Sequence, residues 1–385
     1  MSTVSKTKRK KIYEWLFLLL VVIFFANLLF RIFQYKDNYL KKFDGAYWEH
    51  RYQISQWVVP NSKSSIGDDG LYAYAGYKYV FFGMNPILNS AEVPPLGKYL
   101  IGVTIAVFNN QNIFGLLTGI SSLFAFYLLN LLLFKKKLIA FLPIFVFSLE
   151  PLFWEQLQAN YLDLLYLTFL FMSFYFVIKR KYFFSTFFIG CFAATKFPPT
   201  SIFVALSVFV YVFVHQRKDM TKLLMSFSLW PLVFVISYTR FFMLGNGPIA
   251  FLKVLKYFIH YYQIGVKSEN HTMVFDLLLK GKWATWWGGG VLNVPEWSIL
   301  WPLAFLLTIL SVGCYRKILK GPFLLIFSWI ILYLGFLIII PVAPRYLLLL
   351  LPFLYNISVW VLSEGINMKY LRRSGFFRSI FSSAS

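Results

Sequence analysis

The sequence predicts an all-α polytopic membrane protein. Of its 385 residues, 59% are hydrophobic, and the mean hydropathy is +0.65. A soluble domain could not bury this much apolar surface. The apolar runs are continuous and do not alternate with polar residues, which argues against a β-barrel. Cys191 and Cys314 each lie inside an apolar run, so the sequence indicates neither a disulfide framework nor a metal site.

Eleven apolar segments follow one another along the chain. The first, residues 13–33, follows the basic sequence KTKRKK and is long enough to cross a bilayer whose core is ~30 Å thick. No small-residue cleavage site follows this run, so we expect a retained signal anchor with its N-terminus inside. The other ten segments lie at 97–109, 113–134, 138–153, 160–178, 183–195, 199–214, 223–243, 298–315, 322–341 and 345–362.

The net charge of +22 indicates how these segments are oriented. The basic clusters flank apolar segments, which is the pattern of cytoplasmic loops and not of a nucleic-acid-binding patch. They are Lys135–Lys137, Lys179–Lys181, Arg217–Lys222, Arg316–Lys320 and Lys369–Arg373. We therefore expect one membrane domain over residues 1–364, a basic cytoplasmic tail over 365–385, and two long outer loops, 34–96 and 244–297.

Segment 97–109 conflicts with this alternation. If it crossed the bilayer, the cluster Lys135–Lys137 would lie outside. Either this short segment does not cross fully, or the region 113–153 contains a re-entrant helix. We expect ten or eleven transmembrane helices.

The two long outer loops have the composition of ordered, working segments. Loop 34–96 is rich in Tyr, Trp, Gly and acids, whereas flexible linkers are not. In loop 244–297, apolar residues at helical spacing over 249–263 predict an amphipathic helix on the membrane surface. The run WATWWGGG follows, and its Trp286 would either anchor the loop at the interface or stack on a sugar ring.

The sequence lacks the signatures of common soluble enzymes. GxGxxG, P-loop, HExxH and GxSxG motifs are absent, and the four His residues do not have metal-site spacing. Outer-face carboxylates, cations and aromatic residues remain. They suit a polyprenyl-phosphate sugar, whose transfer needs a carboxylate to take the acceptor's proton and cations to stabilise the leaving phosphate.

Several motifs resemble those of one superfamily, in the same order. EVPPLGKYLIG (92–102) is similar to the HPPLGK motif of protein O-mannosyltransferases and to KPPL in lipid-linked aminoarabinose transferases. Asp44 resembles the first acid of the Asp-Glu motif, in which the Asp is the general base. The further similar segments are EQLQANYLDLLYLTF (155–169), GCFAATKFPPTSIF (190–203), His271 before WATWW, and PVAPRYLLLLLPF (341–353). The chain thus resembles GT-C glycosyltransferases, nearest to the protein O-mannosyltransferase branch.

This resemblance implies roles for eleven residues. Asp44 would be the general base, with Glu92 as a second catalytic carboxylate. Lys98, Lys196 and Arg345 would bind phosphate. The remaining substrate-binding candidates are Glu49, Asp68, Asp69, Asp163, His271 and Trp286. No metal site is predicted, although an acidic pair such as Asp68–Asp69 binds a divalent cation in other branches of the superfamily.

The expected activity is inverting transfer of one sugar, with mannose as a candidate. The donor would be a polyprenyl-phosphate sugar and the acceptor a hydroxyl group of a protein, glycan or lipid on the extracytoplasmic face. The membrane would be the plasma membrane of a prokaryote or the endoplasmic reticulum of a eukaryote. Two alternatives stay open. A flippase for lipid-linked sugars should show internal repeats, which the sequence lacks. Gly45 and Val93 replace motif residues, which leaves open an inactive GT-C partner subunit.

Overall fold

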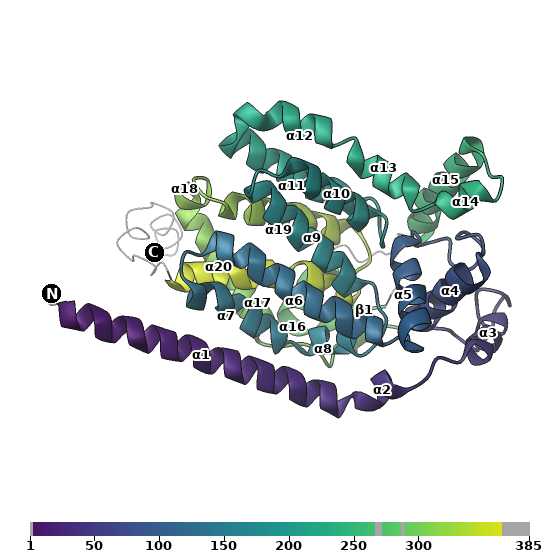
Figure 1. The fold of residues 1–385 in the computed structure, drawn as a ribbon, viewed down its shortest axis with the longest axis horizontal. Coiled ribbons are helices and arrows are strands. Elements are labelled where there is room, and N and C mark those ends of the chain that lie inside the picture. The colour runs from purple at the N-terminus through teal and green to yellow at the C-terminus, as the bar shows by residue number, and fades with distance from the viewer. Residues whose placement is uncertain (1–2, 266–271, 286–288, 364–385) are drawn as a thin grey trace, which may run out of the picture.

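The computed structural model describes residues 3–265, 272–285 and 289–363, and their regular structure is helical apart from one hairpin (Figure 1). The helices of the first half are α1 (Thr3–Gln34), α2 (Lys36–Leu40), α3 (Gly45–Gln53), α4 (Asp68–Phe82), α5 (Leu96–Phe108), α6 (Ile113–Leu133), α7 (Lys137–Ser148), α8 (Pro151–Leu157), α9 (Asp163–Ile178) and α10 (Tyr182–Ala193). The elements of the second half are α11 (Thr200–His215), η1 (Arg217–Asp219), α12 (Met220–Ser226), α13 (Leu229–Ile236), α14 (Thr239–Met243), α15 (Pro248–Gly265), α16 (Met273–Lys280), β1 (Lys282–Ala284), β2 (Val291–Asn293), α17 (Leu300–Ser311), η2 (Val312–Cys314), α18 (Tyr315–Ile318), α19 (Phe323–Ile339), η3 (Pro344–Leu349) and α20 (Leu351–Ser363).

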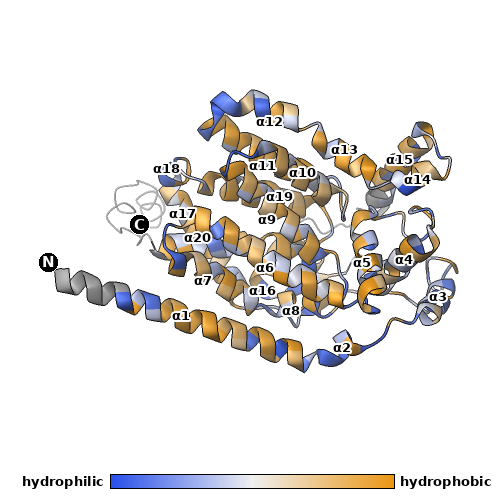
Figure 2. Ribbon diagram, viewed as in Figure 1, coloured by the Kyte–Doolittle hydropathy of each residue, from blue (hydrophilic) through white to orange (hydrophobic). Residues whose placement is uncertain are grey.

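Each predicted apolar segment contains a helix, which confirms the all-α polytopic fold class. Within the described residues, Lys11–Gln34, Ile113–Leu133 and Arg217–Ile236 are long and apolar enough to cross a membrane singly. Helices α7 and α8 are bent by 70° and together pass the same test. The remaining apolar helices are shorter, so the count of ten or eleven spans stays a prediction. Figure 2 shows the apolar residues running along most of these helices.

Helix α5 is the short segment that conflicted with the charge alternation. Its 13 residues extend about 20 Å at the α-helical rise, less than the ~30 Å core of a bilayer. In Figure 1 it lies beside α4 and runs crosswise to α6. A Cβ on Gly76 of α4 would lie 2.3 Å from the Lys98 carbonyl, and one on Gly102 of α5 would lie 2.2 Å from the Gly76 carbonyl. The two backbones therefore touch, and α5 packs as the partner of α4.

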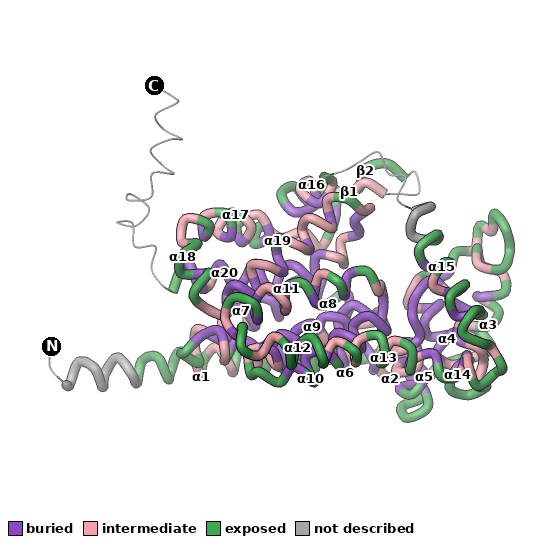
Figure 3. Tube along the Cα trace, turned by 90° about the horizontal axis from the view of Figure 1, so that it is seen from above, coloured by how far each residue is buried: buried purple, intermediate pink, exposed green. Residues whose placement is uncertain are grey.

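One end of the molecule contains helices from the two predicted outer loops and from the segments next to them. Helices α3, α4, α5, α14 and α15 lie together there in both views (Figures 1 and 3). Helix α15 contains the predicted amphipathic segment 249–263, and β1 pairs antiparallel with β2 further along the same loop. In Figure 3 the buried residues run through the middle of the helix bundle, whereas residues 11–34 of α1 are mostly exposed.

Polar side chains inside the core fix the helices that lead to this end. Glu150, at the break between α7 and α8, accepts hydrogen bonds from Trp301 Nε1 at 2.8 Å and from the hydroxyl of Tyr355. Trp329 of α19 donates to the Leu349 carbonyl at 2.8 Å. Because buried polar groups need partners, these bonds specify how α17, α19 and α20 pack. They hold the η3 segment between α19 and α20 in place.

Candidate functional site

A cavity of ≈ 410 Å³ collects residues from segments far apart in the sequence. Five of the eleven predicted site residues line it: Asp68, Glu92, Asp163, Lys196 and Arg345. Aromatic side chains make up much of the remaining wall, namely Trp57, Tyr72, Tyr166, Phe197, Tyr261, Tyr333, Phe336 and Tyr346. A mostly apolar and aromatic pocket with a few converging charges is typical of a ligand-binding site.

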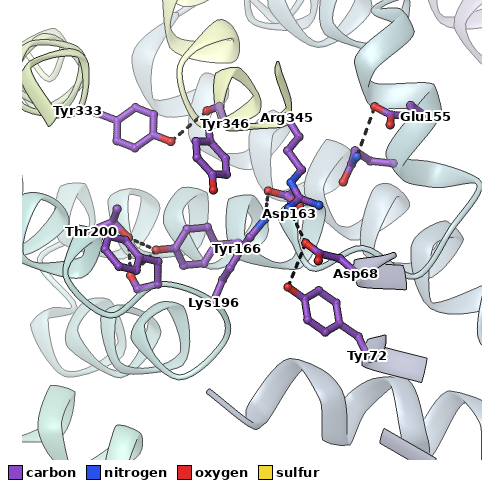
Figure 4. Close-up of polar contacts among 12 residues, drawn as sticks. Asp68, Tyr72, Glu155, Asp163, Tyr166, Lys196, Thr200, Tyr333, Arg345 and Tyr346 are labelled. Atoms are coloured by element: carbon purple, nitrogen blue, oxygen red, sulfur yellow. Dashed lines mark hydrogen bonds and ion pairs between the residues drawn. The ribbon is translucent and has the colours of Figure 1, made fainter. Parts of the chain in front are cut away.

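The first ion pair joins α4 to η3. Asp68 is the first residue of α4, and its Oδ2 lies 2.5 Å from Arg345 Nη2 (Figure 4). Tyr72, one turn along α4, donates its hydroxyl to the same oxygen at 3.3 Å. Burial would raise the pKa of Asp68, but the positive charges of Arg345 and Lys196 outweigh it and lower that pKa. Asp68 is therefore an anion and a weak base in this state.

The second ion pair joins α9 to the connection between α10 and α11. Asp163 begins α9, and its Oδ1 lies 2.6 Å from Lys196 Nζ. The side chains are only 3% and 10% exposed, respectively. Burial lowers the pKa of Lys196 more than Asp163 raises it, and the charge of Arg345 lowers it further. Figure 4 shows Asp163 and Lys196 next to Asp68 and Arg345. An anion entering here would compete with two carboxylates for two cations.

Glu92 forms another part of the wall, just before α5. It is 5% exposed and accepts a hydrogen bond from Ser90 Oγ at 2.6 Å. Burial raises the pKa of Glu92, and the positive charge of Lys98 opposes that rise. Lys98 itself is fully buried and is not among the residues that line the cavity. Its ammonium group donates to the carbonyls of Ser90 at 2.5 Å and Val93 at 2.6 Å.

Asp44, the base expected from the sequence, has a different position. It is the N-cap of α3, and its Oδ1 accepts a hydrogen bond from the Tyr47 amide at 2.9 Å. It does not line the cavity. This geometry gives Asp44 a helix-capping role and offers its predicted role as the base no support.

The capping role predicts the effect of an Asp44→Ala substitution. Loss of an N-cap carboxylate costs about 1 kcal/mol of stability, because an amide at the helix start loses its partner. We expect a small drop in melting temperature and a transfer rate within about twofold of the wild type. A loss of transfer of about 100-fold or more, the scale of losing a general base, would restore Asp44 as the base.

The other predicted residues lie outside this cavity or outside the described part of the chain. Glu49 pairs with Lys78 at 3.0 Å. The backbone carbonyl of Asp69 accepts a hydrogen bond from Asn160 at 2.6 Å, and burial raises the pKa of its side chain. His271 and Trp286 lie outside the described residues. Within residues 3–265, 272–285 and 289–363, no group of three or more His, Cys, Asp or Glu side chains could hold a metal ion.

Sequence reasoning missed the tyrosines of the cavity, although their spacing was visible. Tyr72 lies four residues after Asp68, and Tyr166 lies three residues after Asp163. Both spacings place two side chains on one helix face. Tyr346 directly follows Arg345, and its carbonyl accepts a hydrogen bond from Tyr333 at 3.0 Å. No such signal exists for Trp57 and Tyr261, whose rings stack with their centres 6.5 Å apart although one follows α3 and the other lies in α15.

The comparisons with known proteins show similarity in fold and not in sequence. No protein-family model matches the sequence, and no curated protein sequence matches it. Among solved structures, the chain is similar to ArnT from Cupriavidus metallidurans in its apo state, with a TM-score of 0.56 and 15% identity. It is also similar to ArnT bound to undecaprenyl phosphate, with a TM-score of 0.60 and 16% identity. Each match covers 94% of this chain and 63% of the ArnT chain. The likeness confirms the GT-C fold but not the O-mannosyltransferase branch.

Proposed function

We propose that this protein is an integral-membrane glycosyltransferase that moves a sugar from a polyprenyl-phosphate carrier to a hydroxyl acceptor. The observation that carries the proposal is the meeting of two carboxylate–cation pairs in one cavity, Asp68–Arg345 and Asp163–Lys196. Two facts support it: the fold is that of GT-C, and one similar structure holds undecaprenyl phosphate.

In the proposed reaction, Asp68 is the general base. It takes the proton of the acceptor hydroxyl, and the acceptor oxygen attacks the anomeric carbon. The bond between that carbon and the phosphate oxygen breaks, and polyprenyl phosphate leaves with the electron pair. Arg345 and Lys196 neutralise the leaving phosphate, since both are cations in the cavity wall. A single displacement inverts the anomeric centre.

The resting ion pairs imply an order of events. While Arg345 contacts Asp68, the carboxylate has a lowered pKa and holds a proton poorly. The phosphate of the donor competes for Arg345, and loss of that contact raises the pKa of Asp68. Donor binding therefore makes Asp68 a stronger base.

The polyprenyl tail of the donor would lie against an apolar part of the cavity wall. Phe336, Ile340 and Leu349 form this part, beside the charged residues.

The proposed topology places this cavity on the outer face. Helix α5 packs on α4 and does not cross, so ten spans remain: α1, α6, α7 with α8, α9, α10, α11, α12 with α13, α17, α19 and α20. With the N-terminus inside, every basic cluster then falls inside, and the segments that carry Asp68, Lys196 and Arg345 fall outside. This count removes the conflict at Lys135–Lys137.

Two alternatives fit the structure less well. A flippase would place its charged binding site near the bilayer midplane. Here the charged residues come from helix ends and connections. An inactive subunit would not need a carboxylate and two cations in one cavity. The acceptor stays a proposal at the level of a protein, glycan or lipid hydroxyl group, and mannose stays a candidate sugar.

Cells that lack the protein test this proposal. We expect mass spectrometry to show that one lipid-linked sugar accumulates and that one glycan or glycolipid loses a residue. The wild-type gene should reverse both changes, and a gene carrying Asp68→Asn should reverse neither. Unchanged lipid-linked sugars and glycans in the deleted cells would contradict the proposal.

A further inference from the structure

The PPLGK motif, residues 94–98, lies behind the cavity wall and not in it. Glu92 and Val93, just before the motif, line the cavity, whereas Lys98 has no exposed surface. A lysine that bound the donor phosphate would have to present its ammonium group to the cavity. The ammonium group of Lys98 instead faces the protein backbone, as its two hydrogen bonds show.

These hydrogen bonds hold the segment that carries Glu92. The two carbonyls that accept from Lys98 belong to Ser90 and Val93, which flank Glu92. The Ser90 side chain in turn donates to the Glu92 carboxylate at 2.6 Å. Charge-assisted bonds to buried carbonyls are among the stronger ones, and losing them would leave both carbonyls without a donor. Lys98 thus sets the path of the backbone on both sides of Glu92.

The same motif packs against the segments that carry the second ion pair. The Leu96 amide donates to the Ala194 carbonyl at 3.1 Å, two residues before Lys196. A Cβ added to Gly97 would lie 2.6 Å from Leu162 Cδ2, and Leu162 directly precedes Asp163. Residue 97 must therefore be small, so that the motif can pack against Leu162 next to the Asp163–Lys196 pair.

Charge also links Lys98 to Glu92. Burial lowers the pKa of Lys98 to about 8, and the charge of Glu92 opposes this change. The charges that act on Glu92 are those of Lys98 and Asp68. Five tyrosines also interact electrostatically with it: Tyr52, Tyr79, Tyr238, Tyr257 and Tyr261. Lys98 is the cation among these groups.

We infer that Lys98 is a positioning residue, which holds Glu92 in the cavity wall as an acceptor for substrate hydroxyl groups and does not bind the donor phosphate. The inference rests on the proposed function. It reverses the assignment expected from the motif, in which Lys98 contacts phosphate. It also explains the position of the motif, because Lys98 reaches the backbone beside Glu92 while Leu96 and Gly97 contact the Asp163–Lys196 site.

A double-mutant cycle on the full-length protein tests this inference. Lys98→Met, Glu92→Gln and the double variant would be compared for sugar transfer and for affinity toward undecaprenyl phosphate. We expect Lys98→Met to leave this affinity within about threefold of the wild type and to lower transfer about 10- to 100-fold. If Lys98 acts through Glu92, adding Lys98→Met to Glu92→Gln should change transfer by no more than about twofold.

Two results would overturn the inference. One is a loss of about tenfold or more in undecaprenyl phosphate affinity in Lys98→Met, since a phosphate ligand would cause it. The other is a double variant whose fold loss in transfer rate equals the product of the two single losses, since residues with independent roles would give that result. If the wild-type protein does not bind undecaprenyl phosphate, the proposed function is wrong, and the inference about Lys98 fails with it.

Lys98→Arg provides the readout if Lys98→Met does not fold. Arginine can donate to both carbonyls, and it stays charged at every pH used in an assay. The wild-type transfer rate should fall above pH ≈ 8, where Lys98 loses its proton and its hold on Glu92. In Lys98→Arg this fall should move to higher pH. An unchanged pH profile in Lys98→Arg would contradict the inference.

Discussion

Replacement of Asp68 by asparagine is expected to lower sugar transfer about 10²- to 10⁴-fold, the range found when a general base is removed. The same substitution should tighten the binding of undecaprenyl phosphate, by about three- to tenfold. Asp68 holds Arg345 at 2.5 Å in the resting site, so it competes with the phosphate for that cation. Asparagine keeps the shape of the side chain and removes the competing charge. Few roles for a carboxylate would produce opposite effects on rate and binding.

The measurement compares transfer rate and undecaprenyl phosphate affinity in the purified variants. Asp69→Asn is the matched control, because it removes the same charge from the next residue, which does not line the cavity. We expect Asp69→Asn to stay close to the wild type in both. Full transfer activity in Asp68→Asn would remove Asp68 as the base. Lost transfer with weaker phosphate binding would instead give Asp68 a structural role.

Replacement of Arg345 by methionine should lower transfer about 10²- to 10³-fold, as loss of an oxyanion-stabilising donor does. It should also weaken undecaprenyl phosphate binding by about tenfold or more. The guanidinium group offers paired donors to phosphate oxygens, which methionine lacks. Arg345→Lys should restore only part of the affinity, because lysine carries a point charge without the planar fork.

Arg180→Met is the matched control for the Arg345 variant. Arg180 also pairs with an aspartate, at 3.5 Å from Asp219, but its side chain is 63% exposed and it lies in a predicted cytoplasmic cluster. Its removal should change neither binding nor transfer. If Arg345→Met bound undecaprenyl phosphate as the wild type does, the donor phosphate would have to sit elsewhere. The mechanism proposed for this cavity would then fail.

Much of the fold and the charged part of the candidate site could be predicted from the sequence. Hydropathy located the helices because long continuous apolar runs are typical of membrane-spanning helices. Positive charge and motif order placed Asp68, Asp163, Lys196 and Arg345 on one face, and the structure brings these four side chains together. The crosswise position of α5 could not be predicted, because it depends on the backbone contact between Gly76 and Gly102.

The choice of Asp68 over Asp44 as the proposed base depends on the structure and not on the sequence. Both acids lie at the start of an aromatic-rich helix after the first span, but Asp44 caps α3, whereas Asp68, the first residue of α4, lines the cavity. Two adjacent acids, Asp68 and Asp69, are the better match to an Asp-Glu motif than Asp44 and Gly45, and this signal was available. The orientation of Lys98 could not be predicted, because the carbonyls that accept hydrogen bonds from its ammonium group are brought together only in the folded loop.

The most direct test of glycosyl transfer at this cavity uses proteoliposomes that contain the lipid-linked sugar accumulated by cells lacking the protein. An envelope extract of the same cells would supply the acceptor. The measured quantity is polyprenyl phosphate released from the donor. We predict release by the wild-type protein, together with sugar in the acceptor fraction, and at most about a hundredth of that rate with Asp68→Asn. Passage of the intact lipid-linked sugar across the bilayer without release would contradict the account.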